Sequence, residues 1–487
     1  MDPPALHVLA RELAESDRLR AFAAEPGPAR VSEPLLPLFL SALHLARSSA
    51  APLVCVLPDD ADARDAAEAA GWFLGEERVG LFASRGVRWE SGLMPPPHLV
   101  GERARALDVL AAGGLVCASA LGVAEGLPPA EARPEAIRLR AGDEPGADEL
   151  VALLALAGYE RVERAEERGE FAVRGGIVDV FPTTGREPIR MELFGDEIES
   201  LRAFSAFTQR ALRPLEGAVV YPAVERRLDL VDEPLLDDGE LAPVPRDLVA
   251  PLPQADLVWD PDAVREVWRE ELGRELGLGG AIELDELPRG QPHAFEAQRP
   301  AVAARGLSEA ERDLAAFVRA GNRVVVTFAH RGEALRTQNL LRRVKAELLE
   351  PGDELPDDEG LLFAVAPSRR GFVLRDLGLV LLPDAQVFRK RPPRADVRLG
   401  RALQSFADLR TGDHVVHEDH GIGKLLGFET KTVARVTRDY LFLAFRGDDR
   451  LYVPHEQIGK VSRYVGADGH APALSKLGGR AWQLVKN

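Results

Sequence analysis

Cysteine is almost absent from this chain of 487 residues, which contains only Cys55 and Cys117. Each cysteine lies inside an apolar run, LVCVL or LVCAS, of the kind that forms a buried strand. Disulfide frameworks and cysteine metal sites use more cysteines at characteristic spacings. We therefore expect two core thiols rather than a disulfide or a metal pair.

Long apolar runs are also missing. No stretch of about eighteen apolar residues occurs, so we expect no membrane-spanning helix. Acidic residues interrupt the apolar positions of residues 1–16, which argues against a secretory signal peptide. The 46% hydrophobic and 29% charged residues are an ordinary globular balance, and a length of 487 residues implies three or four domains. With no membrane span and no signal peptide expected, a cytoplasmic protein is the simplest expectation.

Positive charge is in deficit as well, since 61 Lys+Arg stand against 78 Asp+Glu and the formal net charge is −17. This balance argues against broad binding of duplex DNA by the chain as a whole. The charge is uneven: residues 401–487 hold 13 Lys+Arg against 10 Asp+Glu, about +3, which leaves 48 against 68, about −20, for residues 1–400. A mildly basic C-terminal region therefore follows an acidic body.

Catalytic and metal-binding patterns are a further absence. The chain has no G-x-x-x-x-G-K-[ST] nucleotide loop, and no Ser-His-Asp set or paired-carboxylate cleft emerges. His414, His417 and His420 follow one another at spacings of three on an expected strand, which scatters their rings over both faces. We expect no catalytic residue, metal site or cofactor in this chain, and keep a cryptic ATPase only as an alternative.

The region up to about residue 130 alternates helix patterns with short apolar strands. Strands are expected at Leu53–Leu57, Val79–Ala83 and Leu115–Ser119, and helices at Ala61–Ala70 and Gly101–Ala112. Such interleaving predicts a layer of parallel strands covered by helices.

A second α/β region runs from about residue 300 to 394. Ser308 and Glu311 form a capping-box pattern ahead of a helix, Arg323–Phe328 is a strand pattern, and Gly332–Leu349 predicts a long amphipathic helix. These elements carry no catalytic signature, so we expect a structural spacer.

Residues 168–210 show the pattern of short antiparallel strands. Ile189, Met191 and Leu193 alternate with polar residues, and glycines and prolines supply the turns. Arg174 and Arg190 lie on the polar positions of these strands, with Phe194 on the same alternation as Arg190. Arginine and aromatic residues are enriched in the interface positions that contribute most to affinity. The alternative is a solvated strand face with Phe194 folded beneath it.

This stretch resembles the second domain of the excision-repair protein UvrB, and more closely the equivalent domain of the bacterial transcription-repair coupling factors (Mfd). The segments RGEFAVRGGIVDVFP, IRMELFGDEIESLRAF and TQR carry the similarity. The resemblance implies that the domain binds the damage-recognition ATPase UvrA. It also implies that Arg174, Arg190 and Phe194 are the contact residues.

Two departures from UvrB favour the coupling factors. The segment that corresponds to the nucleotide loop of UvrB, residues 29–46, has two prolines and no lysine, whereas a triphosphate needs successive backbone N–H groups and a lysine. Residues 84–97, SRGVRWESGLMPPP, lack the aromatic hairpin with which UvrB probes damaged DNA. We therefore expect a degenerate first domain that does not hydrolyse ATP.

Residues 412–466 predict a small barrel of four or five short strands. The motifs HVVHEDHGIG and LYVP resemble the RNA-polymerase-interaction domain shared by the coupling factors and the CarD-type regulators. The resemblance implies that the barrel extends a sheet edge onto the polymerase β subunit. The candidate edge is residues 429–438, with Lys431, Val433, Arg435 and Val436 as the polymerase-binding residues. A solvated hairpin is the alternative.

The expected architecture is a multidomain α/β protein. It comprises a UvrB-like α/β layer with an inserted small antiparallel β module, a small α/β spacer domain and a C-terminal SH3/Tudor-like β barrel. The expected boundaries are 1–135 for the first part of the UvrB-like domain, 136–212 for the UvrA-binding domain, 213–299 for a return to the first domain with acidic connecting helices, 300–390 for the spacer, 391–408 for a linker, 409–468 for the polymerase-interaction domain and 469–487 for the start of a helix that leads to a motor.

The resemblance implies that the chain is the non-catalytic N-terminal part of a coupling factor for transcription-coupled nucleotide excision repair. It would bind the RNA polymerase β subunit and UvrA as a monomer. ATP, magnesium and most DNA contacts would belong to the ATP-dependent DNA translocase that follows in this family. The alternative is a complete, motor-less CarD-like transcription regulator.

Overall fold

The computed structural model describes residues 3–47, 51–87, 94–206, 208–227, 256–272, 293–388, 414–417, 421–433, 436–447 and 449–454, with short pieces at 236–237, 240–241, 281–284, 461–463 and 474. The fold is mixed α/β and divides into two units, residues 1–133 with 231–390 and residues 134–230 with 391–487. The expected linker 391–408 and almost all of residues 469–487 lie outside the described residues.

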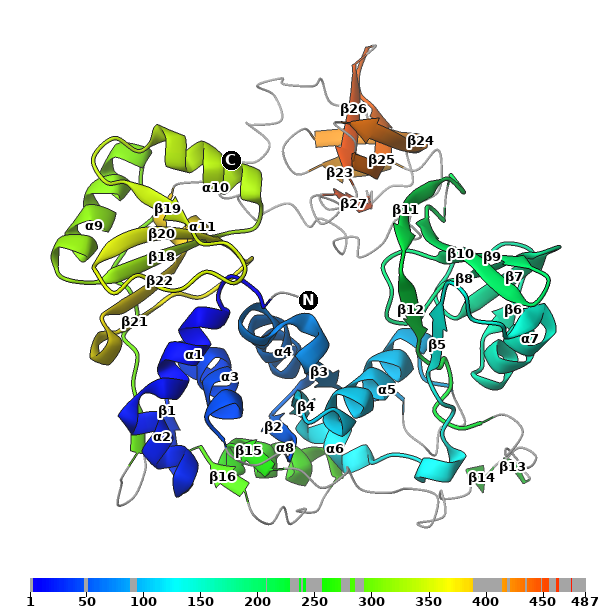
Figure 1. The fold of residues 1–487 in the computed structure, drawn as a ribbon, viewed down its shortest axis with the longest axis horizontal. Coiled ribbons are helices and arrows are strands. Elements are labelled where there is room, and N and C mark those ends of the chain that lie inside the picture. The colour runs from blue at the N-terminus through cyan, green and yellow to red at the C-terminus, as the bar shows by residue number, and fades with distance from the viewer. Residues whose placement is uncertain are drawn as a thin grey trace. The chain divides into compact units, whose positions relative to one another are not determined.

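A parallel sheet of five strands, in the order β16-β15-β2-β4-β3, forms the first layer of unit 1 (Figure 1). Near-continuous apolar runs suit such a sheet because helices cover both of its faces. Two of the three expected strands have the predicted bounds, and the third ends one residue earlier. The strands are β2 (Leu53–Leu57), β3 (Val79–Phe82), β4 (Leu115–Ser119), β15 (Asp256–Trp259) and β16 (Ala281–Glu283).

Alternate residues of these strands face two different cores. Leu53 and Cys55 pack with α1, α3 and α4 on one face, whereas Val54 and Val56 pack with α5, α6 and α8 on the other. The two helices predicted in this region are found as α4 and α5, each longer than expected. The helices are α1 (His7–Glu15), α2 (Asp17–Ala24), α3 (Leu36–Ala46), α4 (Asp60–Leu74), α5 (Pro97–Ala111), α6 (Ala120–Glu125) and α8 (Pro261–Leu272).

The two cysteines lie opposite each other on β2 and β4, where both are free and fully buried. This confirms the expected core thiols. Burial raises the pKa of the Cys117 thiol to about 12. Burial, with a smaller contribution from Cys117, also raises the pKa of Cys55 well above its usual value.

A second sheet in unit 1 has the order β19-β20-β18-β22-β21, in which only β21 runs antiparallel to its neighbour. Helices α9 and α10 pack on one of its faces. The elements are α9 (Leu307–Arg319), β18 (Arg323–Phe328), α10 (Arg331–Leu340), β19 (Ala346–Leu348), β20 (Gly360–Val365), β21 (Phe372–Leu374), β22 (Leu379–Pro383) and α11 (Asp384–Val387). Two further pairs of strands are described in this unit. Strands β1 (Ala29–Val31) and β17 (His293–Phe295) pair in parallel, and the two-residue strands β13 (Leu236–Asp237) and β14 (Glu240–Leu241) pair antiparallel.

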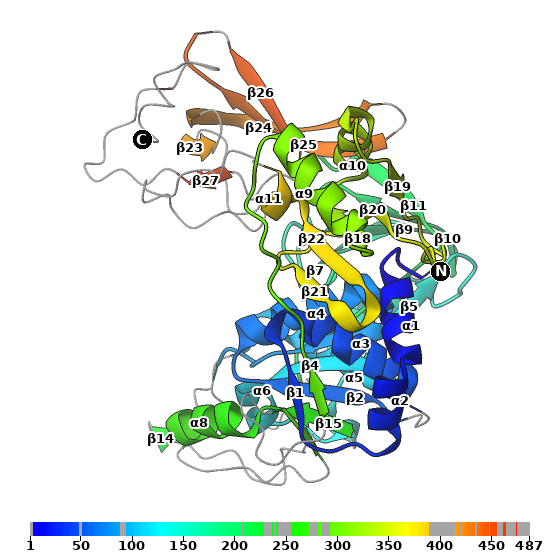
Figure 2. The ribbon, with the colours of Figure 1, turned by 90° about the vertical axis from the view of Figure 1, so that its left-hand side faces the viewer.

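The other face of this second sheet shares one core with the first layer. Val325, Leu362 and Leu381 belong to the same apolar cluster as Leu9 and Phe39. Figure 2 shows strands β21 and β22 beside helices α1 and α3. The region that we expected to be a separate spacer therefore packs directly on the helices of the first layer.

The predicted helix 332–349 is wrong, because α10 ends at Leu340 and β19 follows. The expected capping box at Ser308 and Glu311 does not form either, since no side chain caps α9. Glu311 is buried and its Oε1 accepts the N–H groups of Arg342 at 2.5 Å, Arg343, and Val344 at 3.3 Å. Three successive N–H groups that point at one carboxylate are not donating to helix carbonyls, so the helix cannot continue here.

The first part of unit 2 is built on a six-stranded sheet in the order β11-β10-β9-β8-β7-β6, with α7 (Gly146–Leu156) packed on it. Helix α7 ends two residues before Gly158, whose φ of 82° allows the chain to turn there. The strands are β6 (Glu160–Arg161), β7 (Glu170–Arg174), β8 (Ile177–Val180), β9 (Ile189–Phe194), β10 (Glu197–Phe204) and β11 (Ala211–Leu215).

Residues 215–223 pack on the core of this sheet rather than returning at once to the first domain. Strand β12 (Gly217–Val220) pairs antiparallel with β5 (Ile137–Arg140), and Val220 packs in the same core as Met191. The chain rejoins the parallel sheet of unit 1 later, at β15.

The described C-terminal strands form an antiparallel sheet in the order β26-β25-β24-β23-β27 around Val415, Leu441, Leu443 and Val453. Two of the strands are much longer than expected, because β24 and β25 extend together into a hairpin. The strands are β23 (His414–His417), β24 (Gly421–Val433), β25 (Val436–Ala444), β26 (Arg450–Pro454) and β27 (Val461–Arg463).

Among the described helices, none combines the length and the apolar character that crossing a bilayer requires. Among all the residues that the structure describes, no group of three His, Cys, Asp or Glu side chains could hold a metal ion. His414 and His417 lie on β23, whereas His420 is outside the described residues.

Candidate docking surfaces

Strands β7 to β10 present a polar face opposite the core of their sheet. Ile189, Met191 and Leu193 contribute to the core, so Arg190 and Phe194 point to the other side. Strand pairing places Asp179 of β8 directly beside Arg190 of β9. The alternation predicted for this stretch is therefore present.

Asp179 is the residue that organises this face. Its carboxylate is 1% exposed and accepts hydrogen bonds from Nε and Nη2 of Arg190, both at 2.7 Å, and from Nη2 of Arg174 at 2.5 Å. The hydrogen bonds to Asp179 raise the pKa of Arg190 further, although burial acts in the opposite direction. A buried charge requires an oppositely charged, hydrogen-bonded partner, and here two arginines pair with one carboxylate.

Arg190 has further contacts that hold its side chain in place. Its guanidinium carbon lies 4.4 Å from the centre of the Phe204 ring, and Nη2 donates to Oε1 of Gln209 at 3.2 Å. Only 18% of its side chain is exposed, against 46% for Arg174. Arg190, expected on an open face, therefore has a supporting role as well.

Phe194 is the open member of this surface, with 80% of the residue exposed. It is the last residue of β9, just before Gly195, whose φ of 63° makes the turn to β10. The alternative of a phenylalanine folded beneath the strand face is wrong. Exposed aromatic residues next to arginines are typical of binding surfaces. We call Arg174, Arg190 and Phe194 with Asp179 the arginine–phenylalanine face.

Sequence reasoning missed Asp179. It lies inside the apolar run IVDVFP, and a charged residue between Val178 and Val180 was the available signal. An acidic residue within a strand that also carries core residues requires a cationic partner when buried. The register that brings Arg190 opposite was not readable from the local pattern.

The second expected surface lies on the hairpin of β24 and β25. Lys431 pairs with Arg438 and Val433 with Val436 in the strand register. Arg435 lies outside the described residues, and nothing is described of the side chains of the other three candidates. Along β24, β23 pairs only with residues 421–424, so no described strand covers the outer edge of residues 427–433. Such an edge presents N–H and C=O groups that can pair with another strand.

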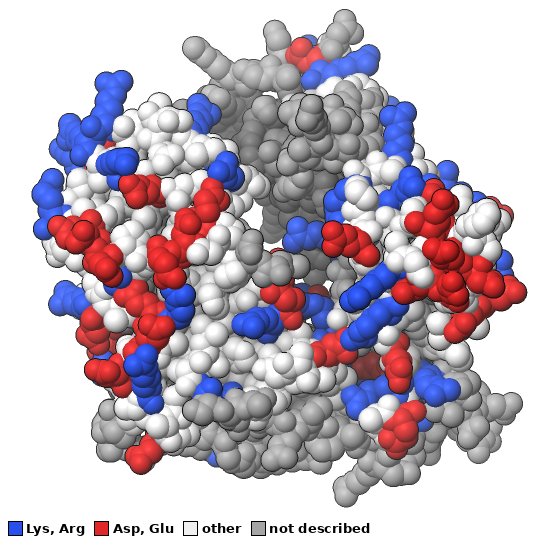
Figure 3. Space-filling model, in the orientation of Figure 1, with Lys and Arg blue, Asp and Glu red and all other residues white. Residues whose placement is uncertain are grey.

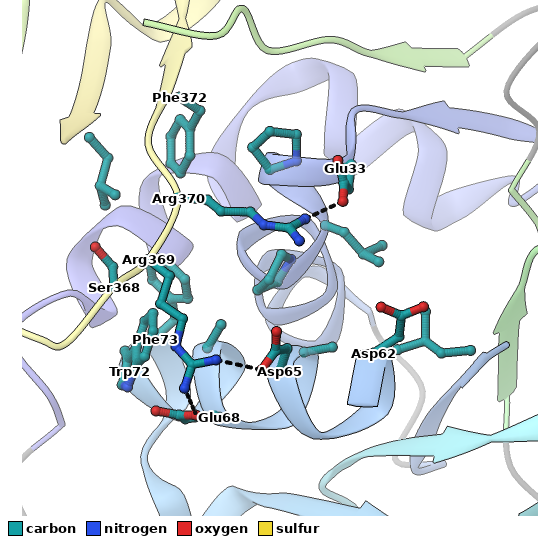
Figure 4. A pocket seen from close by; sticks show the side chains of 17 residues that line it. Glu33, Asp62, Asp65, Glu68, Trp72, Phe73, Ser368, Arg369, Arg370 and Phe372 are labelled. Carbon is teal, nitrogen blue, oxygen red and sulfur yellow. Dashed lines mark hydrogen bonds and ion pairs between the residues drawn. The ribbon is translucent and has the colours of Figure 1, made fainter. Parts of the chain in front are cut away.

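A pocket of about 210 Å³ lies in unit 1 beside the start of α3, in the segment that we expected to correspond to a nucleotide loop (Figure 4). Trp72, Phe73 and Phe372 supply apolar walls. Pro37 is the second residue of α3, and Glu33 and Pro34 occupy the 3-10 turn just before the helix. Prolines remove two of the N–H groups with which a helix start holds phosphates.

Charged residues at the mouth of this pocket are mostly acidic and already paired. Arg370 binds Glu33, while Arg369 lies 3.0 Å from Asp65 and 3.7 Å from Glu68. Burial, and then the neighbouring Asp59, raises the pKa of Asp62. Four carboxylates against two guanidinium groups favour a cationic occupant over a polyphosphate.

Two protein families match separate parts of the chain. Residues 137–225 match the UvrB interaction domain, and residues 409–465 match the CarD-like/TRCF RID domain. The arginine–phenylalanine face lies within the first match and the β24–β25 hairpin within the second. The chain thus combines two interaction domains of DNA repair and transcription proteins.

Full-length relatives agree with this class. The chain is 26% identical to the transcription-repair-coupling factor of Bacillus subtilis over 80% of its length, 30% identical to that of Mycobacterium bovis over 92%, and 25% identical to that of Staphylococcus aureus over 85%. It spans 41 to 45% of the length of these relatives. The chain therefore resembles the part of a transcription-repair-coupling factor that carries its two interaction domains.

Proposed function

We propose that this chain links RNA polymerase to nucleotide excision repair by docking both RNA polymerase and UvrA. The observation that carries the proposal is the occurrence of a UvrB interaction domain and a CarD-like/TRCF RID domain on one chain. In the full-length coupling factor, an ATP-dependent DNA translocase would displace the stalled polymerase while these domains recruit the repair proteins.

The UvrA contact is assigned to the arginine–phenylalanine face. Phe194 supplies an exposed apolar anchor, and Arg174 and the outer edge of Arg190 supply hydrogen-bond donors on the same face of the sheet. The bonds to Asp179 fix both guanidinium groups before a partner arrives. Binding to a preordered surface loses less side-chain entropy, which favours affinity.

The polymerase contact is assigned to the β24–β25 hairpin of an SH3/Tudor-like barrel. A strand of the polymerase β subunit would pair with the uncovered edge of residues 427–433. Lys431, Val433, Arg435 and Val436 would provide side-chain selection on either side of that pairing.

We assign no catalytic step to this chain. Its two matched families are described as interaction domains, and the pocket beside α3 has the wrong charge for a nucleotide. ATP and magnesium would act in the translocase part of a full-length protein, which would also make most DNA contacts. The proposed setting is the cytoplasm, and the proposed state is a monomer.

The UvrA assignment is tested by equilibrium binding of purified UvrA to the intact chain. Phe194→Ala should weaken binding at least tenfold, because truncating an aromatic anchor commonly costs about 2 kcal/mol of binding free energy. Arg174→Ala should weaken it less, because one donor of its guanidinium group is already bonded to Asp179.

Matched controls come from the same domain. Leu153 on α7 is 37% exposed, and the Arg164 side chain is 52% exposed. Leu153→Ala and Arg164→Ala should bind UvrA like the unaltered chain. Equal binding by Phe194→Ala, Arg174→Ala and both controls would remove UvrA from this face.

A further inference from the structure

A cationic surface lies on the second sheet of unit 1, away from both interaction domains in sequence. Residues 334–346 contain Arg336, Arg342, Arg343 and Lys345 and no Asp or Glu. The whole chain has a net charge of −17, so a segment of thirteen residues with a charge of +4 is a local reversal. We call the second half of α10, residues 336–340, together with residues 341–346 the α10 loop surface.

Most of these cations form no ion pair with another described residue. Arg336, Arg342 and Arg343 are exposed, and none has a carboxylate within ion-pair distance among the described residues. The flanking acids are occupied, because Glu347 lies 2.9 Å from Lys345 and Glu350 lies 2.6 Å from Arg331. Figure 3 shows Lys and Arg side chains projecting from the upper rim of this domain.

Glu311 fixes the backbone that carries the two adjacent arginines. Its buried carboxylate accepts the N–H groups of Arg342, Arg343 and Val344. On the other side of the loop, the Gln338 amide donates to the carbonyl of Ala346 at 2.8 Å. Both contacts use backbone groups, so the guanidinium groups remain available while their attachment points are held still.

The shape and composition of this surface select among anionic partners. A depression of about 410 Å³ is bounded by Gln338 and residues 341–346. Thr337 and Asn339 add neutral hydrogen-bonding groups, and residues 331–346 contain no aromatic side chain. Arginine, lysine, threonine and asparagine commonly contact phosphate oxygens. Surfaces that bind single-stranded nucleic acid or protein partners usually also carry aromatic side chains.

From these observations we propose that the α10 loop surface binds the phosphate backbone of duplex DNA without reading its sequence. Arg342 and Arg343 contact phosphates directly, and Arg336 on the last turns of α10 contacts a neighbouring phosphate. Glu311 acts as a positioning residue. The site is local, so it is compatible with an acidic chain that does not coat DNA broadly.

The test uses the intact chain and a fluorescent duplex of mixed sequence with about 20 base pairs, two helical turns. Anisotropy titrations are made at several potassium chloride concentrations. The Arg342→Ala/Arg343→Ala double variant should bind about tenfold more weakly at low salt, and its slope of log affinity against log salt should be less steep by about 2.

A second double variant controls for net charge. Arg20 and Arg161 are exposed and lie on α2 and β6, so Arg20→Ala/Arg161→Ala removes the same two charges elsewhere. This control should keep the affinity and salt slope of the unaltered chain. Equal losses in both double variants, or no loss in either, would overturn the proposal.

The partner class is tested in the same titration. Poly-glutamate and a single strand of equal length compete with the duplex at equal charge concentration. Tighter binding of poly-glutamate would assign the surface to an acidic polypeptide, and tighter binding of the single strand would overturn the choice of duplex.

Glu311→Gln provides a readout that charge alone does not predict. This substitution raises the net charge of the chain by one, which on simple electrostatics would strengthen DNA binding. We expect weaker binding instead, because the loop loses the charged acceptor that holds its N–H groups. Stronger or unchanged binding in a folded Glu311→Gln variant would overturn the positioning role, and UvrA binding by the same sample reports that the rest of the chain is folded.

Discussion

Arg190 and Asp179 form a two-point ion pair on adjacent strands, with both contacts at 2.7 Å and the carboxylate 1% exposed. The exposed Phe194 lies on the same face four residues further along β9, about 13 Å away by strand rise, with Glu192 between them. One side chain therefore contributes to the stability of the sheet and to the surface that we propose for UvrA. Binding data on Arg190 variants need a stability measurement beside them.

Removal of Arg190 should destabilise the domain. Arg190→Ala leaves the buried Asp179 carboxylate with Arg174 alone, so we expect a loss of about 2–4 kcal/mol in local stability. Arg174→Ala should cost less than about 1 kcal/mol, since its side chain is 46% exposed and water replaces its contact. Hydrogen exchange of the β8 and β9 amides in the intact chain measures both changes.

The double variant Arg190→Ala/Asp179→Ala distinguishes the free energy lost with the ion pair from the cost of leaving the buried Asp179 carboxylate unpaired. Removing both partners should recover part of the loss seen in Arg190→Ala, because no buried carboxylate remains unpaired. Equal exchange protection in Arg190→Ala and Arg174→Ala would contradict the supporting role of Arg190.

Short apolar runs in the sequence predicted the buried strands well. β2, β4 and β18 have the expected bounds because a strand covered on both faces is a continuous apolar run closed by turn residues. The outward position of Arg190 also followed from alternation. What alternation cannot give is the register between strands, and that register brings Asp179 to Arg190.

The end of α10 shows a second limit of local patterns. Residues 332–349 keep a helical spacing of apolar residues, yet the helix ends at Leu340. Its end depends on Glu311, which is separated from Arg342 by 31 residues along the chain. A pattern read within a window of one helix carries no information about such a contact.

The pocket beside α3 leads to a prediction about nucleotides. We expect no saturable binding of a fluorescent ATP analogue to this chain, with or without magnesium, because Glu33, Asp62, Asp65 and Glu68 surround the opening and Pro34 and Pro37 remove phosphate-binding N–H groups. Equilibrium anisotropy is the measurement, with a nucleotide-binding relative as the positive control. Saturable binding, or phosphate release above a buffer control, would contradict it.

The β24–β25 hairpin should respond differently to charge and to proline. Lys431→Glu is expected to weaken binding of a polymerase β-subunit fragment strongly at low salt, and the penalty should shrink above about 0.15 M salt, where screening acts within roughly 8 Å. Val433→Pro or Val436→Pro removes one backbone donor and should cost affinity at every salt concentration. Titration of the fragment at several salt concentrations distinguishes the two effects.

Lys424 offers the matched control, because it is an exposed lysine on the same strand where β23 already pairs. Lys424→Glu makes the same charge change outside the uncovered edge and should have the smaller effect. Unaltered affinity in Lys431→Glu and in both proline variants would place the polymerase contact elsewhere on this domain.

Glu311 makes the stability of the α10 loop depend on pH. Burial alone would raise its pKa, but the N–H groups of Arg343, Arg342 and Val344 lower it below the usual value, with help from the charge of Arg343. A carboxyl with a lowered pKa in the folded state stabilises that state above its unfolded pKa of about 4.3. The contribution is lost as the pH falls through the folded pKa.

Glu311→Gln should therefore reduce exchange protection of the 341–345 amides by about tenfold at pH 7, or about 1.4 kcal/mol, because a neutral acceptor replaces a charged one. The difference from the unaltered chain should stay constant down to about pH 5 and narrow below about pH 4, where the native carboxyl also becomes neutral. Comparing the two proteins at each pH cancels the intrinsic pH dependence of exchange.

Arg319, an exposed residue at the end of α9, supplies a control: Arg319→Gln should leave the 341–345 amides unchanged at every pH. A difference between Glu311→Gln and the unaltered chain that persists undiminished at pH 3 would show that side-chain shape, and not the carboxylate charge, holds the loop.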